Sequence, residues 1–254
     1  GSSYERFLAA NIFQPLGMTS TASLPDDTIV PGRVRGFIPG PPPFGVIPAP
    51  WSDHSFDLGS GSLVSTVRDL RRWALAVLSD RLYRRSSFPY PYGWGRLGSD
   101  QKAGIEQTGL GNGFTASLAI WWADSLQIIV LGNIESAQWG RWSADLASIA
   151  RGVAVPVPSR RVEVTLPEGV VACYAGRYET ADHRVEIRER GGSLWAFLDD
   201  WPIPKYLAPV GRSVFELRSD FGRLDFDTTG AAPSTRMVWI FGPDARTAYT
   251  RVVP

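Results

Sequence analysis

Gly59-Ser-Gly-Ser-Leu-Val-Ser-Thr-Val-Arg-Asp-Leu-Arg-Arg-Trp73 is the stretch that decides the fold. Its glycine- and serine-rich start predicts a turn. Ser65 or Thr66 can then cap a helix, and Asp69 follows Thr66 by three residues, as in a capping box. The apolar residues that follow recur at helical spacing and share one face: Leu70, Trp73, Ala74 and Val77. The stretch therefore predicts a tight turn that leads directly into a helix with one buried side.

Upstream of this stretch, a helix is expected over Tyr4 to Phe13, because its apolar residues fall on one face. Pro15 and Gly17 are expected to end it. Residues 24–55 are dense in proline and glycine, which predicts a loop, yet they also contain several aromatic residues. Because a long ordered loop inside a domain is usually functional, we interpret it as a wall of a binding site.

Downstream, the apolar runs Ser117 to Trp122 and Leu126 to Gly132 are separated by three turn-forming residues, which predicts a β-hairpin. A helix is expected over Trp139 to Ile149. Residues 151–161 contain two prolines and break the periodicity, so they are interpreted as a linker between domains.

From residue 162 to the end, short alternating runs are separated by turn residues, which is typical of a small antiparallel barrel or sandwich. The sequence therefore predicts an α+β protein. Residues 1–150 are expected to form an antiparallel sheet with flanking helices, and residues 162–254 an all-β, barrel-like accessory domain.

Composition limits the function classes. The net charge is +1 at pH 7, so no large positive field favours nucleic acid or an anionic membrane. One cysteine and two histidines are too few for a metal cluster, and no metal or other cofactor is expected. The apolar stretch Leu118 to Leu131 is too short to span a bilayer, so no membrane span is expected.

Five segments, in order, resemble the class C β-lactamase and penicillin-binding-protein superfamily of serine hydrolases. The segments are Asn11-Ile-Phe-Gln-Pro-Leu-Gly-Met18, the Gly59 to Trp73 stretch, Tyr92-Gly-Trp-Gly95, Gln107-Thr-Gly-Leu-Gly-Asn-Gly-Phe114 and Leu126-Gln-Ile-Ile-Val-Leu-Gly-Asn133. In the C-terminal part, Cys173-Tyr-Ala-Gly-Arg-Tyr178 resembles the opening of the small β-domain that many esterase and peptidase members carry. The resemblance implies a β-lactamase-like fold whose N-terminal part lies upstream of residue 1.

The resemblance also implies a mechanism. Such enzymes use the serine of a Ser-x-x-Lys motif as nucleophile, a Tyr-x-Asn motif as proton relay, and a Lys-Thr-Gly or His-x-Gly strand. Neither of the first two motifs is found where the family would place it, and no Tyr-x-Asn occurs in the chain. Ser99-Asp-Gln-Lys102 matches Ser-x-x-Lys formally, but it lies in a polar stretch after a glycine. We therefore expect no nucleophile or general base on this chain.

The third motif is expected at Gln107, Thr108 and Gly109, where Gln107 stands in the usual place of lysine or histidine. Gln107 can donate hydrogen bonds but brings no charge for a substrate carboxylate. Thr108 could bond a substrate carbonyl or carboxylate, and Gly109 lets a ligand approach the strand. The resemblance makes the N–H of Leu110 the candidate second oxyanion donor. The alternative is that these residues are simply the entry to a strand.

Phe44 and Trp51, in the proline-rich loop, are candidates to line the substrate pocket, although loop aromatics also serve as anchors. The expected partners are a small ester, amide or peptide substrate and an upstream segment of the same protein. Without that segment, apolar sheet and helix faces would be exposed, so the chain alone is expected to be poorly soluble or to assemble with it.

Three functions stay open at this point. The first is a part of a serine hydrolase, with Ser-x-x-Lys and Tyr-x-Asn in the upstream segment. The second is an inactive homologue or truncated fragment that acts as a binding or interaction module. The third places the function in the C-terminal β-domain, as a binder of a polymer or partner. The compartment is left open between the periplasm, the exterior and the cytoplasm.

Overall fold

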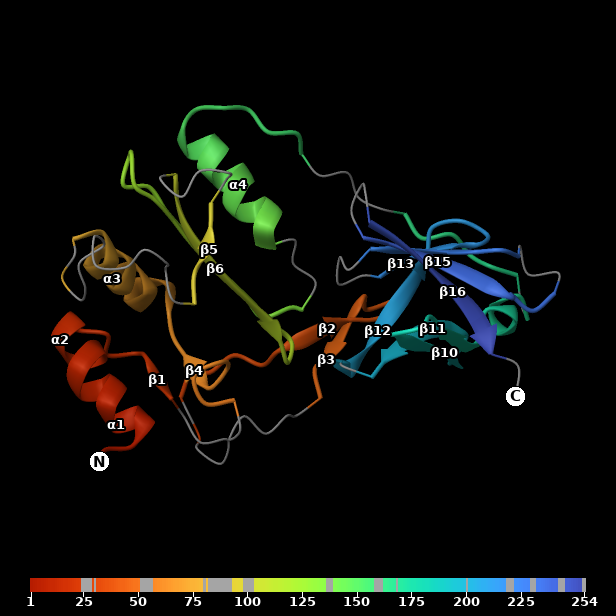
Figure 1. Ribbon diagram of the computed structural model, residues 1–254, viewed down its shortest axis with the longest axis horizontal. Coiled ribbons are helices and arrows are strands. Elements are labelled where there is room, and N and C mark those ends of the chain that lie inside the picture. Colours follow the sequence, from red (N-terminus) through yellow and green to blue (C-terminus); the bar gives the residue numbers. More distant parts are fainter. Residues whose placement is uncertain are drawn as a thin grey trace. The chain divides into compact units, whose positions relative to one another are not determined.

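A computed structural model gives the fold of the chain (Figure 1). It describes residues 1–254 apart from 24–28, 30, 51–56, 80, 82–92, 98–102, 136–138, 158–161, 168, 200, 218–221, 229–231, 242–244 and 253–254. The contacts divide the chain into two compact units. The first contains Gly1–Gly36, Trp51–Asn133 and Gln138–Pro156, and the second contains Phe37–Pro50, Ile134–Ala137 and Val157–Pro254.

The first unit begins with one helical run made of α1 (Tyr4–Leu8), the π-helical turn η1 (Ala9–Phe13) and α2 (Gln14–Leu16). Ser3 caps the run, because its hydroxyl accepts a hydrogen bond from the N–H of Arg6. Pro15 and Gly17 were expected to end the helix; the run continues through Pro15 and ends at Gly17, whose φ of 68° is left-handed. Proline is tolerated there because it sits in the first turn of α2.

Helix α3 (Val67–Leu78) begins as the capping box predicts, with the Thr66 hydroxyl accepting from the N–H of Asp69. The Asp69 side chain is almost fully buried and accepts hydrogen bonds from the N–H of Ser20 (2.7 Å), the hydroxyl of Thr21 (2.9 Å) and Arg72 (2.6 Å). A buried carboxylate needs such partners. Asp69 therefore ties the segment after α2 to the start of α3, beside the short pair β1 (Ala22–Ser23) and β4 (Leu63–Val64).

The central sheet is antiparallel, in the order β5 (Gly95–Arg96), β6 (Gly104–Gly111), β7 (Phe114–Trp121) and β8 (Gln127–Gly132). Ala74 and Val77 of α3 form an apolar cluster with Ile105, Leu118 and Ile120 on one face of the sheet. Helix α4 (Trp139–Ala150) covers the other face (Figure 1). The predicted hairpin of β7 and β8, and the sheet with flanking helices, are confirmed.

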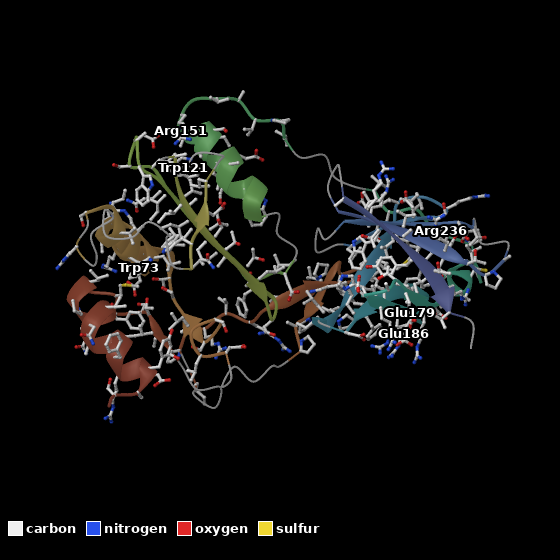
Figure 2. The ribbon with its side chains drawn as sticks, viewed as in Figure 1. Trp73, Trp121, Arg151, Glu179, Glu186 and Arg236 are labelled. Atoms are coloured by element: carbon white, nitrogen blue, oxygen red, sulfur yellow. The ribbon has the colours of Figure 1, made fainter. Side chains whose placement is uncertain are left out.

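The end of α4 is attached to the turn between β7 and β8. The guanidinium of Arg151 lies 5.0 Å from the centre of the Trp121 ring, and both residues are labelled in Figure 2. Its Nε donates to Asp124 Oδ2 at 2.7 Å, and this hydrogen bond lowers the pKa of Asp124 below its ordinary value. The two contacts fix the end of the helix against the sheet.

The second unit contains the hairpin of β2 (Phe37–Pro39) and β3 (Val46–Pro48), which lies within the stretch that the sequence predicts to be loop. The loop prediction for these residues is wrong, because paired strands form there despite prolines at the ends of both. Each proline stands at a strand end, where a missing N–H costs least.

A closed antiparallel barrel makes up most of the second unit, in the order β10-β11-β12-β13-β14-β15-β16-β9. Its strands are β9 (Gly176–Glu179), β10 (Arg184–Arg190), β11 (Ser193–Leu198), β12 (Trp201–Pro209), β13 (Val214–Leu217), β14 (Arg223–Phe226), β15 (Arg236–Phe241) and β16 (Ala245–Val252). Closure leaves no sheet edge unpaired. The predicted barrel-like domain is therefore confirmed.

The Tyr174–Tyr178 segment leads into β9 of the barrel. It follows the 3-10 turn η3 (Val171–Cys173), and the buried rings of Tyr174 and Tyr178 pack among the apolar side chains inside the barrel. The hydroxyl of Tyr178 donates to the carbonyl of Tyr174 at 3.0 Å. A Cβ at Gly176 would lie 2.7 Å from Nε of Arg251, whose guanidinium donates to the carbonyl of Ala175 at 2.7 Å. The glycine therefore makes room for the arginine.

No helix in the part of the chain that the structure describes has the length and apolar content needed to cross a membrane.

Asp227 gives the barrel a testable pH dependence. Partial burial raises the pKa of its carboxyl, but hydrogen bonds from Thr235 and Ser234 outweigh this effect and lower the pKa to about 2. Because the folded-state pKa is below the unfolded one, the stabilisation is present above pH 4 and is lost as the pH falls through 2. At pH 6 we expect the free energy of unfolding of the wild type to exceed that of Asp227→Asn by on the order of 1 kcal/mol, since solvent screens an exposed carboxylate. Urea unfolding at pH 6 and pH 2 measures this difference at both pH values; a difference as large at pH 2 as at pH 6 would contradict the assignment.

Candidate functional site

The third-motif residues lie on β6, and the turn after that strand sets its register. Asn112 and Gly113 have φ values of 53° and 82°. Asn-Gly is the preferred pair for a two-residue hairpin turn with positive φ at both positions. Gly111 lies opposite Phe114 across the turn, and Gln107 lies opposite Leu118 further along. The turn therefore determines which way every residue of β6 points.

Backbone groups of β6 alternate between its two sides. The carbonyl of Ala103, just before the strand, accepts a hydrogen bond from the N–H of Trp122 on the β7 side. The carbonyl of Gly104 accepts from the N–H of Leu97 on the opposite side. Successive residues of an antiparallel ladder point in opposite directions. The even-numbered residues of β6 therefore direct their N–H and C=O groups away from β7.

Thr108 and Leu110 are two of these outward-directed residues. On this side of β6, β5 pairs only with Ile105 and Glu106. No described strand pairs with β6 at Thr108 or Leu110. The backbone groups of these two residues thus form an open edge, which an extended ligand can meet as an additional strand. An N–H on such an edge is held rigidly by the sheet, which is a property that an oxyanion donor needs.

The side chains of Gln107 and Thr108 leave the sheet on opposite faces. Gln107 is exposed and lies opposite Leu118, on the face that α3 covers. Thr108 is half-buried and lies opposite Ser117, on the face of α4. The structure therefore places the four predicted residues on one strand, but only Thr108 and Leu110 direct their backbone groups to the open edge.

A polar group that sequence reasoning missed supports this strand from the α4 side. The Ser117 hydroxyl is buried, lies 2.5 Å from the hydroxyl of Ser143 on α4, and donates to Oε1 of Glu106 at 3.3 Å. The sequence could not predict this contact, because no local pattern links a serine in a strand with a serine in a distant helix. Buried hydroxyls are costly unless bonded, so this contact fixes β6 and β7 against α4.

Gly109 and Gly104 on the same strand have different roles. A Cβ at Gly104 would lie 2.2 Å from the carbonyl oxygen of Ile120, so packing requires that glycine. A Cβ at Gly109 would meet only the Cβ of Ala116, at the ordinary contact distance of 3.8 Å. The fold itself therefore has room for a side chain at Gly109. What a side chain there would obstruct is the approach of a ligand to the exposed strand.

The remaining predicted residues are not brought to β6 by the described contacts. Phe44 lies in the turn of the β2–β3 hairpin of the second unit and is 83% exposed. Trp51 lies outside the described residues, as do Ser99 and Lys102. Among the residues that the structure describes, no group of three or more His, Cys, Asp or Glu side chains could hold a metal ion.

The β-lactamase family matches residues 1–141, which is more than half of the chain. The chain therefore belongs to the β-lactamase family, within the superfamily of serine hydrolases that resemble β-lactamases and penicillin-binding proteins. A comparison with curated proteins finds no match.

Several solved structures are similar. The crystal structure of SurE is 19% identical, with 99% of this chain and 64% of that chain covered and a TM-score of 0.48. The octameric penicillin-binding protein homologue from Pyrococcus abyssi is 14% identical, with 98% and 60% covered and a TM-score of 0.46. A penicillin-binding protein from Bacillus halodurans is 20% identical, with 58% and 50% covered and a TM-score of 0.47. The chain thus spans less than two thirds of the length of each.

The Gly109→Ala variant separates packing from ligand approach. We expect it to fold as wild type, because a Cβ at this position makes only an ordinary contact and alanine in a strand costs no more than glycine. Ligand binding or probe labelling at this edge should fall by about ten-fold or more, since the methyl group blocks close approach. Thermal unfolding and a labelling time course measure the two effects. The matched control, Gly104→Ala, should instead lose stability; equal labelling of Gly109→Ala and wild type would contradict a site here.

Proposed function

We propose that this chain forms part of a serine hydrolase that cleaves ester, amide or D-peptide substrates through an acyl-enzyme. The observation that carries the proposal is the open edge of β6, where the N–H of Leu110 and the backbone of Thr108 face outward beside Gly109. Membership of the β-lactamase family supports the reaction class. The upstream segment would supply Ser-x-x-Lys and Tyr-x-Asn.

In the proposed reaction, the hydroxyl of the upstream serine attacks the substrate carbonyl while the neighbouring lysine or tyrosine takes its proton. The negative charge that develops on the carbonyl oxygen is stabilised by two N–H groups, that of the nucleophile and that of Leu110. The same relay returns the proton to the leaving group as its bond to the carbonyl carbon breaks. A water molecule then gives its proton to the same relay and attacks the carbonyl carbon of the acyl-enzyme. The bond to the serine oxygen breaks, the relay returns the proton to the serine, and the acid is released. No cofactor enters either step.

Two features of the first unit support an additional segment. Strand β8 pairs only with β7 within the described part of the sheet, so its other edge is open. Apolar side chains on β8 and α4 are exposed, namely Leu131 at 39%, Leu146 at 41% and Ile149 at 54%. An open edge and uncovered aliphatic side chains on neighbouring elements are features that proteins normally cover. An upstream strand and helix of the same protein would cover both.

A second candidate function is a non-catalytic binding module. Gln107 favours it, because a neutral amide replaces the lysine or histidine that gives the third motif its positive charge. Gln107 is exposed on the sheet, so it could hydrogen-bond a ligand without activating it. The same substitution also fits a hydrolase of neutral esters or amides, whose substrates carry no carboxylate at that position.

A fluorophosphonate probe distinguishes the two candidates. The complete protein, with its upstream segment, is treated with the probe, digested and examined by mass spectrometry, with heat-denatured protein as the control. We expect one serine of the upstream segment to gain the phosphonyl group, since a fluorophosphonate labels only an activated serine. No serine within residues 1–254 should react.

Each outcome has a clear meaning. Absence of label from the folded complete protein would contradict the serine hydrolase and favour the non-catalytic binding module. Label within residues 1–254, with Ser99 the first candidate, would place the nucleophile on this chain and contradict the assignment made here.

A further inference from the structure

Glu106 carries the only charge on the three long strands of the central sheet. All other side chains of β6, β7 and β8 are neutral, and these strands are described along their full lengths. Gln107, the next residue of β6, is neutral as well. The strand whose edge is open therefore brings one negative charge, and no positive charge, to the candidate site.

A hydrogen bond from Ser117 directs the Glu106 carboxylate towards the open part of β6. The Ser117 hydroxyl donates to Oε1 of Glu106 at 3.3 Å, and Ser117 lies opposite Thr108 in the ladder. Glu106 itself lies opposite Ala119, so this bond runs diagonally between the two strands. The carboxylate is therefore directed along β6 towards Thr108, on the face that α4 covers.

The carboxylate is half-buried, and its described contacts include no cation. Within the part of the chain that the structure describes, the bond from Ser117 is the one side-chain hydrogen bond of Glu106. Ser117 is in turn fixed by the buried hydroxyl of Ser143, at 2.5 Å. A carboxylate that is partly removed from water is unfavourable unless a cation pairs with it. The two serines thus hold the group in place and leave its charge for a ligand to neutralise.

The residues paired with Glu106 leave it open towards the edge of the sheet. On the β5 side its partner is Gly95, which is exposed and has no side chain. On the β7 side its partner is Ala119, whose methyl group is buried. A ligand that lies along the edge at Thr108 can therefore extend a group towards Glu106 without meeting a side chain of either partner.

The spacing of a sheet suits a ligand with a positively charged group at this place. On an added strand, a side chain beside Thr108 on this face would lie about 7–8 Å from Glu106 along the diagonal, within reach of a long side chain. An ammonium group there would form a charge-assisted hydrogen bond with the carboxylate, whereas a carboxylate would meet a like charge. The edge therefore favours cationic over anionic ligands.

We propose that Glu106 is a specificity-determining residue, whose carboxylate binds an ammonium group of the substrate. The site then takes esters, amides or peptides that carry an amine, and it disfavours those that carry a carboxylate at the same place. Ser117 and Ser143 are positioning residues, which hold the carboxylate on the α4 face. This inference rests on the proposed hydrolase for its effect on turnover, and it names the charge of the substrate that the hydrolase would select.

Three p-nitrophenyl esters of similar chain length test the preference: 6-aminohexanoate, heptanoate and the monoester of adipate. The complete protein, with its upstream segment, hydrolyses each ester, and the uncatalysed rate is subtracted. In wild type we expect the kcat/KM for the ammonium ester, divided by that for the neutral ester, to be about ten-fold higher than in Glu106→Gln. The carboxylate ester should be the poorest substrate of wild type. Gln keeps an oxygen that accepts from Ser117, so the melting temperature should stay near that of wild type.

Two controls accompany the variant. Glu5→Gln removes the same charge from α1, outside the sheet, and should leave all three kcat/KM values unchanged. In wild type, the ratio of ammonium to neutral ester should fall as salt rises from about 20 mM to about 500 mM, because ions screen the attraction. The salt series needs no variant, so it decides the question if Glu106→Gln does not fold.

Equal ratios in wild type and Glu106→Gln would overturn the proposal, because a residue that only ties α4 to the sheet does not respond to substrate charge. A ratio that salt does not change would overturn it too. If wild type takes fluorophosphonate label and shows either result, the hydrolase stands and only the role of Glu106 fails. If wild type takes no label and hydrolyses none of the esters, the hydrolase fails. Titration with 6-aminohexanamide and heptanamide, followed by NMR, then decides the charge preference: weaker binding of the amine by Glu106→Gln supports it, and equal binding overturns it.

Discussion

The ladder between β6 and β7 is the constraint on which the candidate site depends. The two-residue turn at Asn112 and Gly113 fixes its register, and a slip by one residue would turn every side chain and every backbone group to the opposite side. With the register set, Leu110 directs its N–H to the open edge, and Gly109 keeps that edge free of side chain. Helices α3 and α4 pack on the two faces of the sheet. The apolar cluster around Ile120 holds α3, and the Ser117–Ser143 contact holds α4.

Local patterns predicted the elements whose residues alternate or recur against a single apolar face. The capping box at Thr66, the β7–β8 hairpin and the C-terminal barrel are correct because each rests on a local pattern: a capping pair, two apolar runs separated by turn residues, and short runs between turn residues. The hairpin of β6 and β7 was also within reach of the sequence, since Asn112-Gly113 is a strong hairpin signal. That dipeptide was taken only as part of a motif, so the turn that fixes the site was missed.

Long-range contacts explain what the sequence could not predict. Strand β12 was missed because Pro202, Pro204 and the charged Lys205 argue against a buried strand, and the partner that makes Lys205 acceptable is Glu135, 70 residues away. The β2–β3 hairpin was read as loop because its stability comes from Ile203 and other residues of the barrel. The roles assigned to Gln107, Thr108, Gly109 and Leu110, and to Phe44 and Trp51, rest on family resemblance and on the geometry of β6, and they stay predictions.

We propose that residues 1–254 complete a β-lactamase fold together with an upstream segment of the same protein, and this proposal is the centre of the account. The most direct measurement is to produce the two parts as separate polypeptides, alone and together, and to determine their assembly by size-exclusion chromatography with light scattering. The account predicts that residues 1–254 alone aggregate or stay poorly soluble, because the β8 edge and the exposed side chains of α4 are uncovered, and that the two parts together form a soluble complex with one copy of each. A stable, soluble monomer of residues 1–254 that does not bind the upstream part would contradict it.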